Sequence, residues 1–499
     1  MIPMLQNAPL YRLLADDLEA AIVRGALPSG ARLSSVRQCA AQRALSFNTV
    51  TAAYRLLEDR GLIEARPQSG YYVKSSLPAP ESPLRDEPGD VLIQAAETRD
   101  LVAVVLQSQQ RADYADLALA CPRGAIFYPG DKLARLAAGI LRKQPSLIAN
   151  YALPPGSARL RSQIARRGML LGMRLRPEDI ILTHGAMEAL QLALRAVTRP
   201  GDTVGVESPT YFNLYPLLAS LGLKALEIPT DPQHGLSLDV LELLLAEKRL
   251  SAVVAMPTVH NPLGCTMSLA GKARLAQLAN RYQTPLIEDA LYAELQFGAT
   301  LSPAVKSFDH AGWVIVCASY TKTLAPDFRI GWMEAGRFSE QVRQLKFTSS
   351  IAEPALLAET VGQFLEGGGY DHHLRVLRRL YSRQIDTVRG LIARWFPAGT
   401  RATRPAGGFL LWLEFPDSVD TLVLFHAALA ERITIMPGML YSAGARYRHC
   451  LRLSCCHELD ERFMAALRRL GELASRQCSS ASVLDGAQMP APQLLIERA

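Results

Sequence analysis

The chain has 499 residues, which is too long for one ordinary domain, so we expect two or three. Hydrophobic residues make up 49% of it and charged residues 20%, which is typical of a soluble globular protein, and no uninterrupted apolar stretch is long enough to span a bilayer. The net charge of +7 is too small for this length to establish a nucleic-acid partner, although nine Lys/Arg against six Asp/Glu in residues 1–76 concentrate part of the excess at the N-terminal end.

The first predicted helix lies in the segment "YRLLADDLEAAIVRG". It places four apolar residues on one face: Leu14, Leu18, Ala21 and Ile22. Gly25 can end this helix. After the turn "LPSGARL", a second short helix is predicted in "SSVRQCAAQRA", which Ser34 or Ser35 can cap.

A third helix is predicted in "SFNTVTAAYRLLEDRG", with Ser46 as its cap. Its buried stripe is expected to consist of Val50, Ala53, Tyr54 and Leu57. The following "LIEARPQSGYYV" predicts two short strands around the turn "PQSG". Three helices and a hairpin within residues 1–74 outline a winged helix-turn-helix, and the alternative is a small helical cap or dimerisation domain.

Several side chains of this outline are suited to DNA. The third helix begins with short polar residues that can reach base edges or phosphates: Ser46, Asn48, Thr49 and Thr51. The hairpin carries Arg66 and Gln68 beside Gly70, where the backbone can approach a phosphate closely. Arg37 lies near the start of the second helix, where a phosphate contact is expected.

The rest of the chain predicts an α/β architecture. Residues 75–90, rich in Pro, Ser and charge, predict a linker. Residues 91–475 alternate helical stretches with the apolar strand candidates "DIILTHG", "TVGVES", "AVVAMPT", "PLIEDA" and "WVIVCAS", which favours a largely parallel sheet. Long helices with "GGFLLWLEF" and "CLRLSC" suggest a smaller α/β subdomain near the end of this range. The Ser/Ala/Pro-rich residues 476–499 are expected to be a loose tail.

Lys322 in "SYTKTLAPDFRIGW" directly follows the strand candidate "WVIVCAS". This strand would deliver the lysine to the C-terminal edge of the sheet, where open α/β sheets bind ligands. Ser319 and Thr321 flank the lysine with hydroxyls, and Arg329 supplies a planar cation suited to phosphate. The lysine could therefore form a Schiff base with an aldehyde cofactor whose phosphate Arg329 and Ser319 hold, although a lone lysine is most often a solvated surface charge.

Such a cofactor requires an acid beside its pyridine nitrogen, and "PLIEDALYAEL" offers Asp289 at a strand end. The alternative role for this aspartate is a helix cap. Tyr292 could hydrogen-bond the phenolic oxygen next to the Schiff base and help set its pKa. Asn261 in "VHNPLG" could be a second donor to that oxygen, although its neighbours also favour a simple turn.

Three further stretches supply groups that could face a ligand. In "LTHGAMEALQLAL", free backbone N–H groups at Gly185 and Ala186, where a helix starts, could bind the phosphate. Tyr211 in "ESPTYFN" could stack on the cofactor ring. Arg452 in "CLRLSC" would suit the carboxylate of an amino-acid ligand, because a strand disfavours an unpaired charge.

Cysteines and histidines do not indicate a metal site. None of the eight cysteines forms a C-x-x-C, and Cys455 and Cys456 are neighbours, so we expect reduced thiols in a cytosolic protein. His372 and His373 are adjacent on a predicted helix and do not face one partner. The N-terminus lacks the basic start and apolar run of a signal peptide.

In this order and context, the motifs resemble the fold-type-I aminotransferase family of pyridoxal-phosphate enzymes over roughly residues 100–475. The most specific are "HNPLG", "EDALY" and "SYTKTLAPDFRIGW". The resemblance implies pyridoxal 5'-phosphate on Lys322, the pyridinium nitrogen on Asp289, the phenolic oxygen on Tyr292 and Asn261, and a substrate carboxylate on Arg452. Tyr151 in "NYALPPGSARLRSQIARRG" would match the tyrosine that reaches the neighbouring subunit's phosphate, which implies a homodimer.

A winged-helix head joined to this fold resembles the MocR-type subfamily of GntR regulators, and "SSVRQCAAQRALSFNTVTAAYRLLEDRGLIEARPQSGYYV" matches the GntR-type head along its length. The resemblance implies a cytoplasmic bacterial transcription regulator that binds promoter DNA and senses an amino acid, amine or vitamer. Two alternatives remain open. One is a working aminotransferase with an incidental or autoregulatory head. The other is a DNA-binding protein whose large domain serves only for dimerisation, against which the intact Lys322, Asp289 and Arg329 count.

Overall fold

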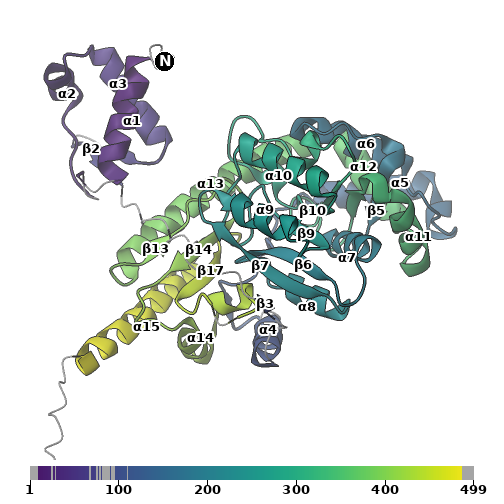
Figure 1. The fold of residues 1–499 in the computed structure, drawn as a ribbon. Coiled ribbons are helices and arrows are strands. Elements are labelled where there is room, and N and C mark those ends of the chain that lie inside the picture. Colours follow the sequence, from purple (N-terminus) through teal and green to yellow (C-terminus); the bar gives the residue numbers. More distant parts are fainter. Residues whose placement is uncertain are drawn as a thin grey trace, which may run out of the picture. The chain divides into compact units, whose positions relative to one another are not determined.

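The structure is a computed structural model of the chain, and it describes residues 9–23, 26–27, 30–66, 69–74, 77, 80, 90–91, 96–108, 111–444 and 446–485. The chain divides into two compact units, one holding the N-terminal domain and the other holding the large α/β domain (Figure 1). Within the described ranges, no helix is both long and apolar enough to cross a bilayer.

The N-terminal domain has the predicted order of helices and strands: α1 (Leu10–Val23), α2 (Val36–Arg43), α3 (Phe47–Asp59), β1 (Ile63–Arg66) and β2 (Gly70–Val73). Ser35 caps α2 in a reciprocal pair with Gln38, and Ser46 caps α3 by accepting from the Thr49 N–H. β1 and β2 pair antiparallel as a hairpin. Gly25, the predicted end of α1, lies outside the described residues.

The core of this domain confirms the predicted stripe of α3, since Val50, Ala53, Tyr54 and Leu57 are all buried. Leu14 and Ile22 of α1 are buried against it, while Leu18 and Ala21 are half-buried. The Tyr54 hydroxyl donates to the Ser34 carbonyl at 2.8 Å, which ties α3 to the start of the second helix.

The large domain is built around a mixed sheet with strand order β3–β7–β6–β9–β10–β11–β12–β5, and β8 pairs with β7. The strands are β3 (Asp90–Val91), β5 (Ile180–Thr183), β6 (Thr203–Ser208), β7 (Lys224–Asp231), β8 (Gly235–Leu236), β9 (Ala252–Ala255), β10 (Leu286–Asp289), β11 (Val314–Ser319) and β12 (Gly331–Glu334). Strands β7, β6, β9, β10 and β11 run parallel, while β12 is antiparallel to both neighbours. The predicted, largely parallel sheet is thus confirmed.

Helices cover both faces of this sheet (Figure 1). One face packs against α7 (Ala186–Val197), α8 (Leu214–Ser220) and α11 (Ser339–Ser349), and the other against α9 (Leu238–Ala246) and α10 (Leu269–Tyr282). Successive residues of β11 point to opposite faces of the sheet, since Val314 packs with α9 and α10 while Ile315 packs with α7 and α8. Burial on both faces explains why the strands are almost continuously apolar.

Further helices complete the large unit: α4 (Ala96–Ser108), α5 (Gly130–Lys143), α6 (Ala158–Gly168) and α12 (Ala355–Glu366). α12 packs against both α5 and α6.

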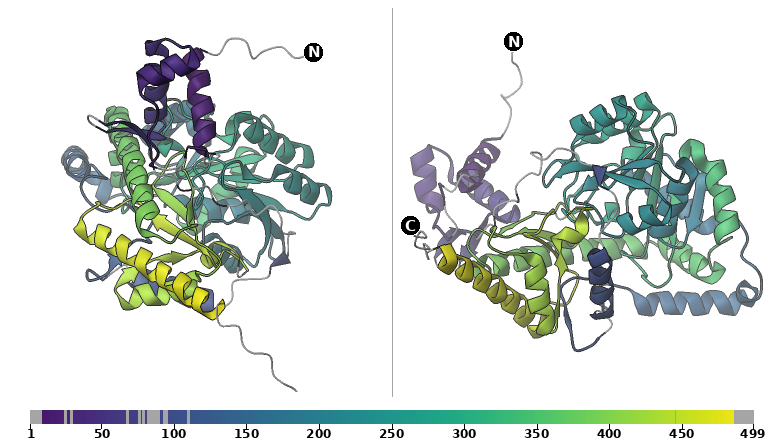
Figure 2. Two further views of the ribbon diagram at one scale, coloured as in Figure 1. Left: turned by 90° about the vertical axis from the view of Figure 1, so that its left-hand side faces the viewer. Right: turned by 60° about the horizontal axis from the view of Figure 1, so that its bottom comes forward.

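A smaller antiparallel sheet has the order β13–β14–β17–β16, with β13 (Arg401–Ala402), β14 (Leu410–Glu414), β16 (Met436–Pro437) and β17 (Cys450–Ser454). A short parallel pair, β4 (Ala115–Asp116) with β15 (Ile433–Thr434), lies in the same unit. The helices of this part are α14 (Thr421–Ala430), α15 (Glu461–Asp485) and α13 (Gly369–Trp395) as far as Ile385 (Figure 2). The remainder of α13, from Asp386, is grouped with the N-terminal unit. α15 continues past Arg476, so the first part of the expected loose tail is helical, and residues 486–499 lie outside the described residues.

The parallel strands all end at one edge of the large sheet, and this edge positions the candidate site. β10 ends at Asp289 and β11 at Ser319, while β5 leads directly into Gly185. The motifs selected from the sequence therefore converge in space although they are far apart along the chain.

Candidate functional site

A cavity of about 230 Å³ lies at this edge of the sheet. Its lining includes predicted site residues from widely separated stretches: Ala186, Tyr211, Asn261, Asp289, Tyr292, Lys322, Arg329 and Arg452. The motifs that the sequence presents one after another thus form a single site.

Lys322 lies just past the end of β11, and its Nζ donates to the Ala120 carbonyl at 2.6 Å. Burial lowers the pKa of Lys322, and the positive charges of Arg452 and Arg329 lower it as well. A lysine with a lowered pKa presents more of its neutral amine, which is the form that attacks an aldehyde. Lys322 therefore fits the covalent attachment of an aldehyde cofactor.

Asp289 closes β10 and is only 6% exposed. Its Oδ1 accepts from the Leu291 N–H at 3.0 Å. Burial raises the pKa of Asp289 to about 7, and the neighbouring Glu207 and Glu288 contribute to this rise. A protonated pyridine nitrogen would supply a positive partner and favour the ionised carboxylate, so Asp289 fits the ring of a pyridine cofactor.

Asn261 and Tyr292 supply polar groups to the same cavity. The Asn261 Oδ1 is buried and has no hydrogen-bond partner among the described residues. Tyr292 packs edge-on against Phe409 with ring centroids 5.5 Å apart, and burial raises its pKa well above the usual value. The phenol therefore keeps its proton and can donate to a ligand oxygen. A buried polar atom without a partner indicates that a ligand completes the site.

Replacing Asp289 with asparagine is expected to flatten the pH dependence of stability in the cofactor-free protein. The unfolded chain ionises this carboxyl near its ordinary pKa of 3.8, whereas the folded chain holds its pKa at about 7. Its contribution to stability is complete below the unfolded pKa and is lost as the pH rises through the folded pKa, by up to about 4 kcal/mol. Thermal unfolding between about pH 5 and about pH 8 should show a smaller decline for Asp289→Asn than for the unmodified protein. Equal declines would contradict this prediction.

The turn of residues 183–186, here called the Gly185 turn, joins β5 to α7. Gly185 has a φ of +82°, and a Cβ on it would lie 2.8 Å from Arg329 Nη2. The Arg329 guanidinium therefore packs directly on this glycine, with Nη2 3.5 Å from the His184 carbonyl oxygen. The Gly185 N–H, predicted to be free for a phosphate, instead donates to the Thr183 carbonyl at 2.9 Å. The Ala186 N–H at the start of α7 together with the Arg329 guanidinium favours binding of a phosphate.

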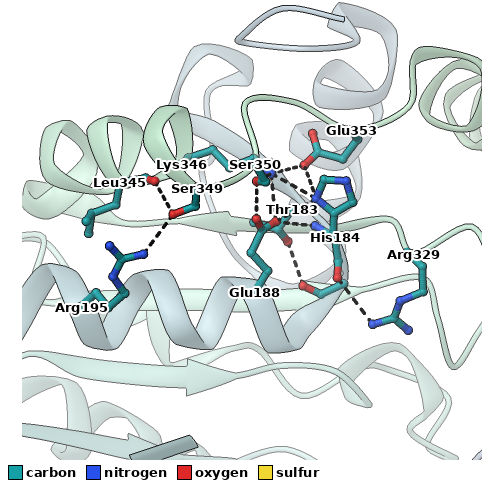
Figure 3. A network of polar contacts seen from close by, with 11 residues as sticks. Thr183, His184, Glu188, Arg195, Arg329, Leu345, Lys346, Ser349, Ser350 and Glu353 are labelled. Atoms are coloured by element: carbon teal, nitrogen blue, oxygen red, sulfur yellow. Dashed lines mark hydrogen bonds and ion pairs between the residues drawn. The ribbon is translucent and has the colours of Figure 1, made fainter. Parts of the chain in front are cut away.

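A network of polar side chains lies behind the Gly185 turn (Figure 3). Glu188 of α7 accepts from the His184 N–H at 2.6 Å and from Lys346 Nζ at 2.9 Å. Lys346 also donates to Glu353 at 2.5 Å and to Ser350 at 2.8 Å. Burial opposes the ionisation of Glu188, but hydrogen bonds from His184, Ser350 and Lys346 outweigh it and hold its pKa well below the usual range.

This network also accounts for a cluster with the spacing of metal ligands. His184, Glu188 and Glu353 bring their ligand atoms within 4.8 Å of one another. The Lys346 ammonium is bonded to both carboxylates and takes the place that a cation would occupy. The cluster is therefore a brace that fixes the Gly185 turn against α11.

Arg452 lies in β17 and is 2% exposed. Its Nη2 donates to the Ala118 carbonyl, and its guanidinium lies 5.4 Å from the centroid of the Tyr441 ring. Its Nε and Nη1 have no hydrogen-bond partner among the described residues. A buried guanidinium with unpaired N–H groups is costly unless an anion pairs with it, so Arg452 fits a ligand carboxylate.

Ser319 and Tyr151 do not line this cavity. The Ser319 hydroxyl lies 3.0 Å from both Thr321 Oγ1 and the Ile330 carbonyl oxygen, inside the turn that follows β11. Thr321, the other hydroxyl residue predicted beside Lys322, lines the cavity instead. Tyr151 is 86% exposed on the segment that precedes α6, so its hydroxyl is open to contact by another molecule.

The predicted DNA-contacting residues are exposed or half-exposed wherever the structure describes them: Arg37, Ser46, Asn48, Thr49, Thr51, Arg66 and Gly70. Gln68 lies outside the described residues. Some of these groups already make local contacts, since the Thr51 hydroxyl donates to the Phe47 carbonyl at 2.9 Å. Arg66 pairs with Glu64 at 2.8 Å and lies over the Tyr72 ring at 4.4 Å, which holds its guanidinium along the hairpin.

Arg32 is a basic residue of the head that was not predicted to contact DNA. It forms a β-bridge with Tyr72, and a Cβ on Gly70 would lie 3.5 Å from its Nε. Arg32 therefore adds positive charge beside Gly70 on the hairpin. Arg32 is far from the hairpin in the sequence, so this placement could not be predicted from a local pattern.

Comparisons with known proteins match both units. The family described as "Bacterial regulatory proteins, gntR family" matches residues 10–73, and "Aminotransferase class I and II" matches residues 127–470. The HTH-type transcriptional regulator YdcR of Escherichia coli (strain K12) is 36% identical over 468 residues, which cover 93% of this chain and 98% of YdcR. This chain belongs to the MocR-type subfamily of GntR regulators. A second E. coli regulator of this kind, YjiR, is 33% identical over 93% of this chain and 99% of its own length.

Solved structures similar to the large domain of this MocR-type regulator are aminotransferases. The multiple substrate aminotransferase of Thermococcus profundus is 26% identical with a TM-score of 0.70, covering 78% of this chain and 97% of that protein. The α-aminoadipate aminotransferase LysN of Thermus thermophilus, solved with a phosphopyridoxyl-leucine compound, is 27% identical with a TM-score of 0.69, covering 78% and 96%. The chain is thus a DNA-binding regulator with a fold-type-I aminotransferase domain, and its homologues imply dependence on pyridoxal 5'-phosphate.

Proposed function

We propose that this regulator carries pyridoxal 5'-phosphate on Lys322 and senses an amino acid, amine or vitamer at the same site. The observation that carries the proposal is the convergence of Lys322, Asp289, Arg329 and Arg452 on one cavity. When bound, the cofactor supplies an aldehyde that joins reversibly to amines and a ring that withdraws electrons. The chemical state of the site would then alter how two DNA-binding heads are placed.

The side chains around the cavity divide into groups by the part of the cofactor that each would hold. Asp289 would pair with the pyridine nitrogen, Tyr292 and Asn261 would bond the phenolic oxygen, and Tyr211 would stack on the ring. Arg329, the Ala186 N–H and the Thr321 hydroxyl would hold the phosphate. Ser319, which bonds the Thr321 hydroxyl, and Gly185, on which the Arg329 guanidinium packs, would support this position. The unpaired nitrogens of Arg452 support its proposed role with a ligand carboxylate.

The proposed assembly is a cytoplasmic homodimer on promoter DNA. Tyr151 is almost fully exposed and would reach the phosphate held by the second subunit. Two heads would then read two half-sites. Arg37, Arg66 and Arg32 would contact DNA phosphates, which position the head without reading sequence.

Fluorescence anisotropy with the full chain tests this proposal. A duplex selected by the cofactor-loaded protein from a random library serves as the DNA probe, and amino acids, amines and B6 vitamers serve as candidate effectors. We expect at least one of them to change the Kd for DNA by about tenfold or more at fixed salt. If none changes DNA binding while an amino acid and a keto acid turn over rapidly, the chain is a working aminotransferase and the proposal fails.

A further inference from the structure

Once the cofactor is bound, one charged side chain of the described cavity lining is still available to bind an effector. Within the described lining, the charged side chains are Asp289, Lys322, Arg329 and Arg452. Under the proposed function the first three hold the ring nitrogen, the aldehyde carbon and the phosphate. Arg452 remains, and it can pair with one carboxylate.

The wall beside Arg452 is apolar. Met436 of β16 lies directly opposite Arg452 of β17 in the sheet register, and its side chain lines the cavity. Leu119 also lines the cavity, and it follows Ala118, whose carbonyl accepts from Arg452. The strand partner and the chain segment nearest this guanidinium thus both present hydrocarbon.

Helix α4 extends this wall. Val102, Val105 and Leu106 line the cavity, and Val105 is 1% exposed. The hydroxyl of Thr434 donates to the hydroxyl of Ser108 at 2.9 Å, which fixes the end of α4 two residues before Met436 in the chain. The three α4 side chains, Leu119 and Met436 therefore form one surface, here called the apolar wall.

We infer that the effector is an α-amino acid with an uncharged, apolar side chain. Its carboxylate pairs with Arg452, and its side chain packs on the apolar wall. Its amino group would replace the Lys322 amine on the aldehyde carbon of the cofactor, and Lys322 would be released as a free amine. The inference rests on the proposed function and adds the chemical class of the ligand to it.

The apolar wall disfavours amino acids with charged side chains, because such a charge would be buried without a partner. A second carboxylate or an ammonium on the side chain would enter a region where the described lining offers no opposite charge beyond the groups already engaged. Burying such a charge without a partner is strongly unfavourable, so L-aspartate and L-lysine should bind at least about 100-fold more weakly than L-leucine, L-methionine or L-phenylalanine.

Isothermal titration calorimetry of the cofactor-loaded full chain with these five amino acids tests the inference. Val105→Asp should weaken leucine binding by at least about 100-fold, because it buries a carboxylate in the apolar wall. Val105→Lys should relatively favour aspartate over leucine, because it introduces an opposite charge. Val423→Asp on α14 is the matched control, since Val423 is 55% exposed, and it should bind leucine as the unmodified protein does.

The melting temperature and the cofactor absorbance of each variant establish that it is folded and loaded. Tighter binding of aspartate or lysine by the unmodified protein would overturn the inference and leave the proposed function standing. Unchanged leucine binding by folded Val105→Asp would also overturn it. If no amino acid, amine or vitamer binds to the loaded protein, both the inference and the proposed function fail.

Discussion

Replacing Lys322 with alanine is expected to abolish covalent retention of the cofactor and every response to an effector. Of the described residues that line the cavity, only Lys322 carries a primary amine. Borohydride reduction followed by peptide mapping should therefore tag the unmodified protein at position 322 and leave Lys322→Ala without a tag. The Kd for DNA should change by less than about threefold, because the residues proposed to contact DNA phosphates lie in the N-terminal domain.

Lys224→Ala is the control for this experiment, because Lys224 is an exposed lysine on β7. It should retain the tag, the cofactor absorbance and the effector response. A tag at any other lysine of the unmodified protein would contradict the assignment of Lys322. Loss of DNA binding in a folded Lys322→Ala variant would contradict the independence of the head.

Replacing Gly331 with alanine is expected to destabilise the large domain and to weaken binding at the site proposed for the cofactor phosphate. A Cβ on Gly331 would lie 2.6 Å from the Gly185 carbonyl carbon, 2.7 Å from Gly185 Cα and 2.8 Å from Thr183 Oγ1. The first two are backbone atoms, so β12 and the Gly185 turn must separate. Overpacking of this kind costs about 1–3 kcal/mol. The melting temperature and the affinity for pyridoxal 5'-phosphate should therefore both be lower than in the unmodified protein.

Gly139→Ala is the matched control for this substitution. Gly139 lies inside α5, and a Cβ on it would meet nothing within 4 Å. Alanine there should leave cofactor binding unchanged and raise stability by up to about 1 kcal/mol, because alanine is the better helix former. Equal melting temperatures and equal cofactor affinities for the two variants would remove Gly331 from its proposed role.

The head could be predicted closely from the sequence because each of its signals is local. Ser35 and Ser46 cap the helices that they precede, and the periodic apolar residues of α3 are the buried ones. The convergence of the site could be predicted for a different reason. Asp289 and Lys322 follow apolar strands, and parallel strands bring their carboxyl ends to one edge.

Other parts of the site have no sequence signal, because they depend on backbone groups or on distant contacts. The carbonyls of Ala118 and Ala120 accept from Arg452 and Lys322, yet any residue supplies a carbonyl. The choice of Thr321 over Ser319 as a lining residue depends on which way the turn after β11 rotates its hydroxyls.

β12 is one of the antiparallel strands of the large sheet, as are β3 and β8, and it was not predicted from the motifs. β12 begins inside the stretch that was selected for Arg329, and it runs antiparallel to β11 and β5. Residues 320–330, which join β11 to β12, contain no crossover helix, so the two strands must be antiparallel neighbours. The last two residues of that motif, Gly331 and Trp332, thus begin a strand as well as following the phosphate-binding candidate Arg329.

The brace behind the Gly185 turn joins stretches of the large domain that are far apart in the sequence. Lys346 bonds Glu188, which holds the turn, and Glu353, which precedes α12. A Cβ on Gly156 would lie 3.9 Å from Glu353 Oε2, at the end of the segment that carries Tyr151. Ionic contacts therefore tie the Gly185 turn to α11 and to the start of α12, next to the segment that exposes Tyr151.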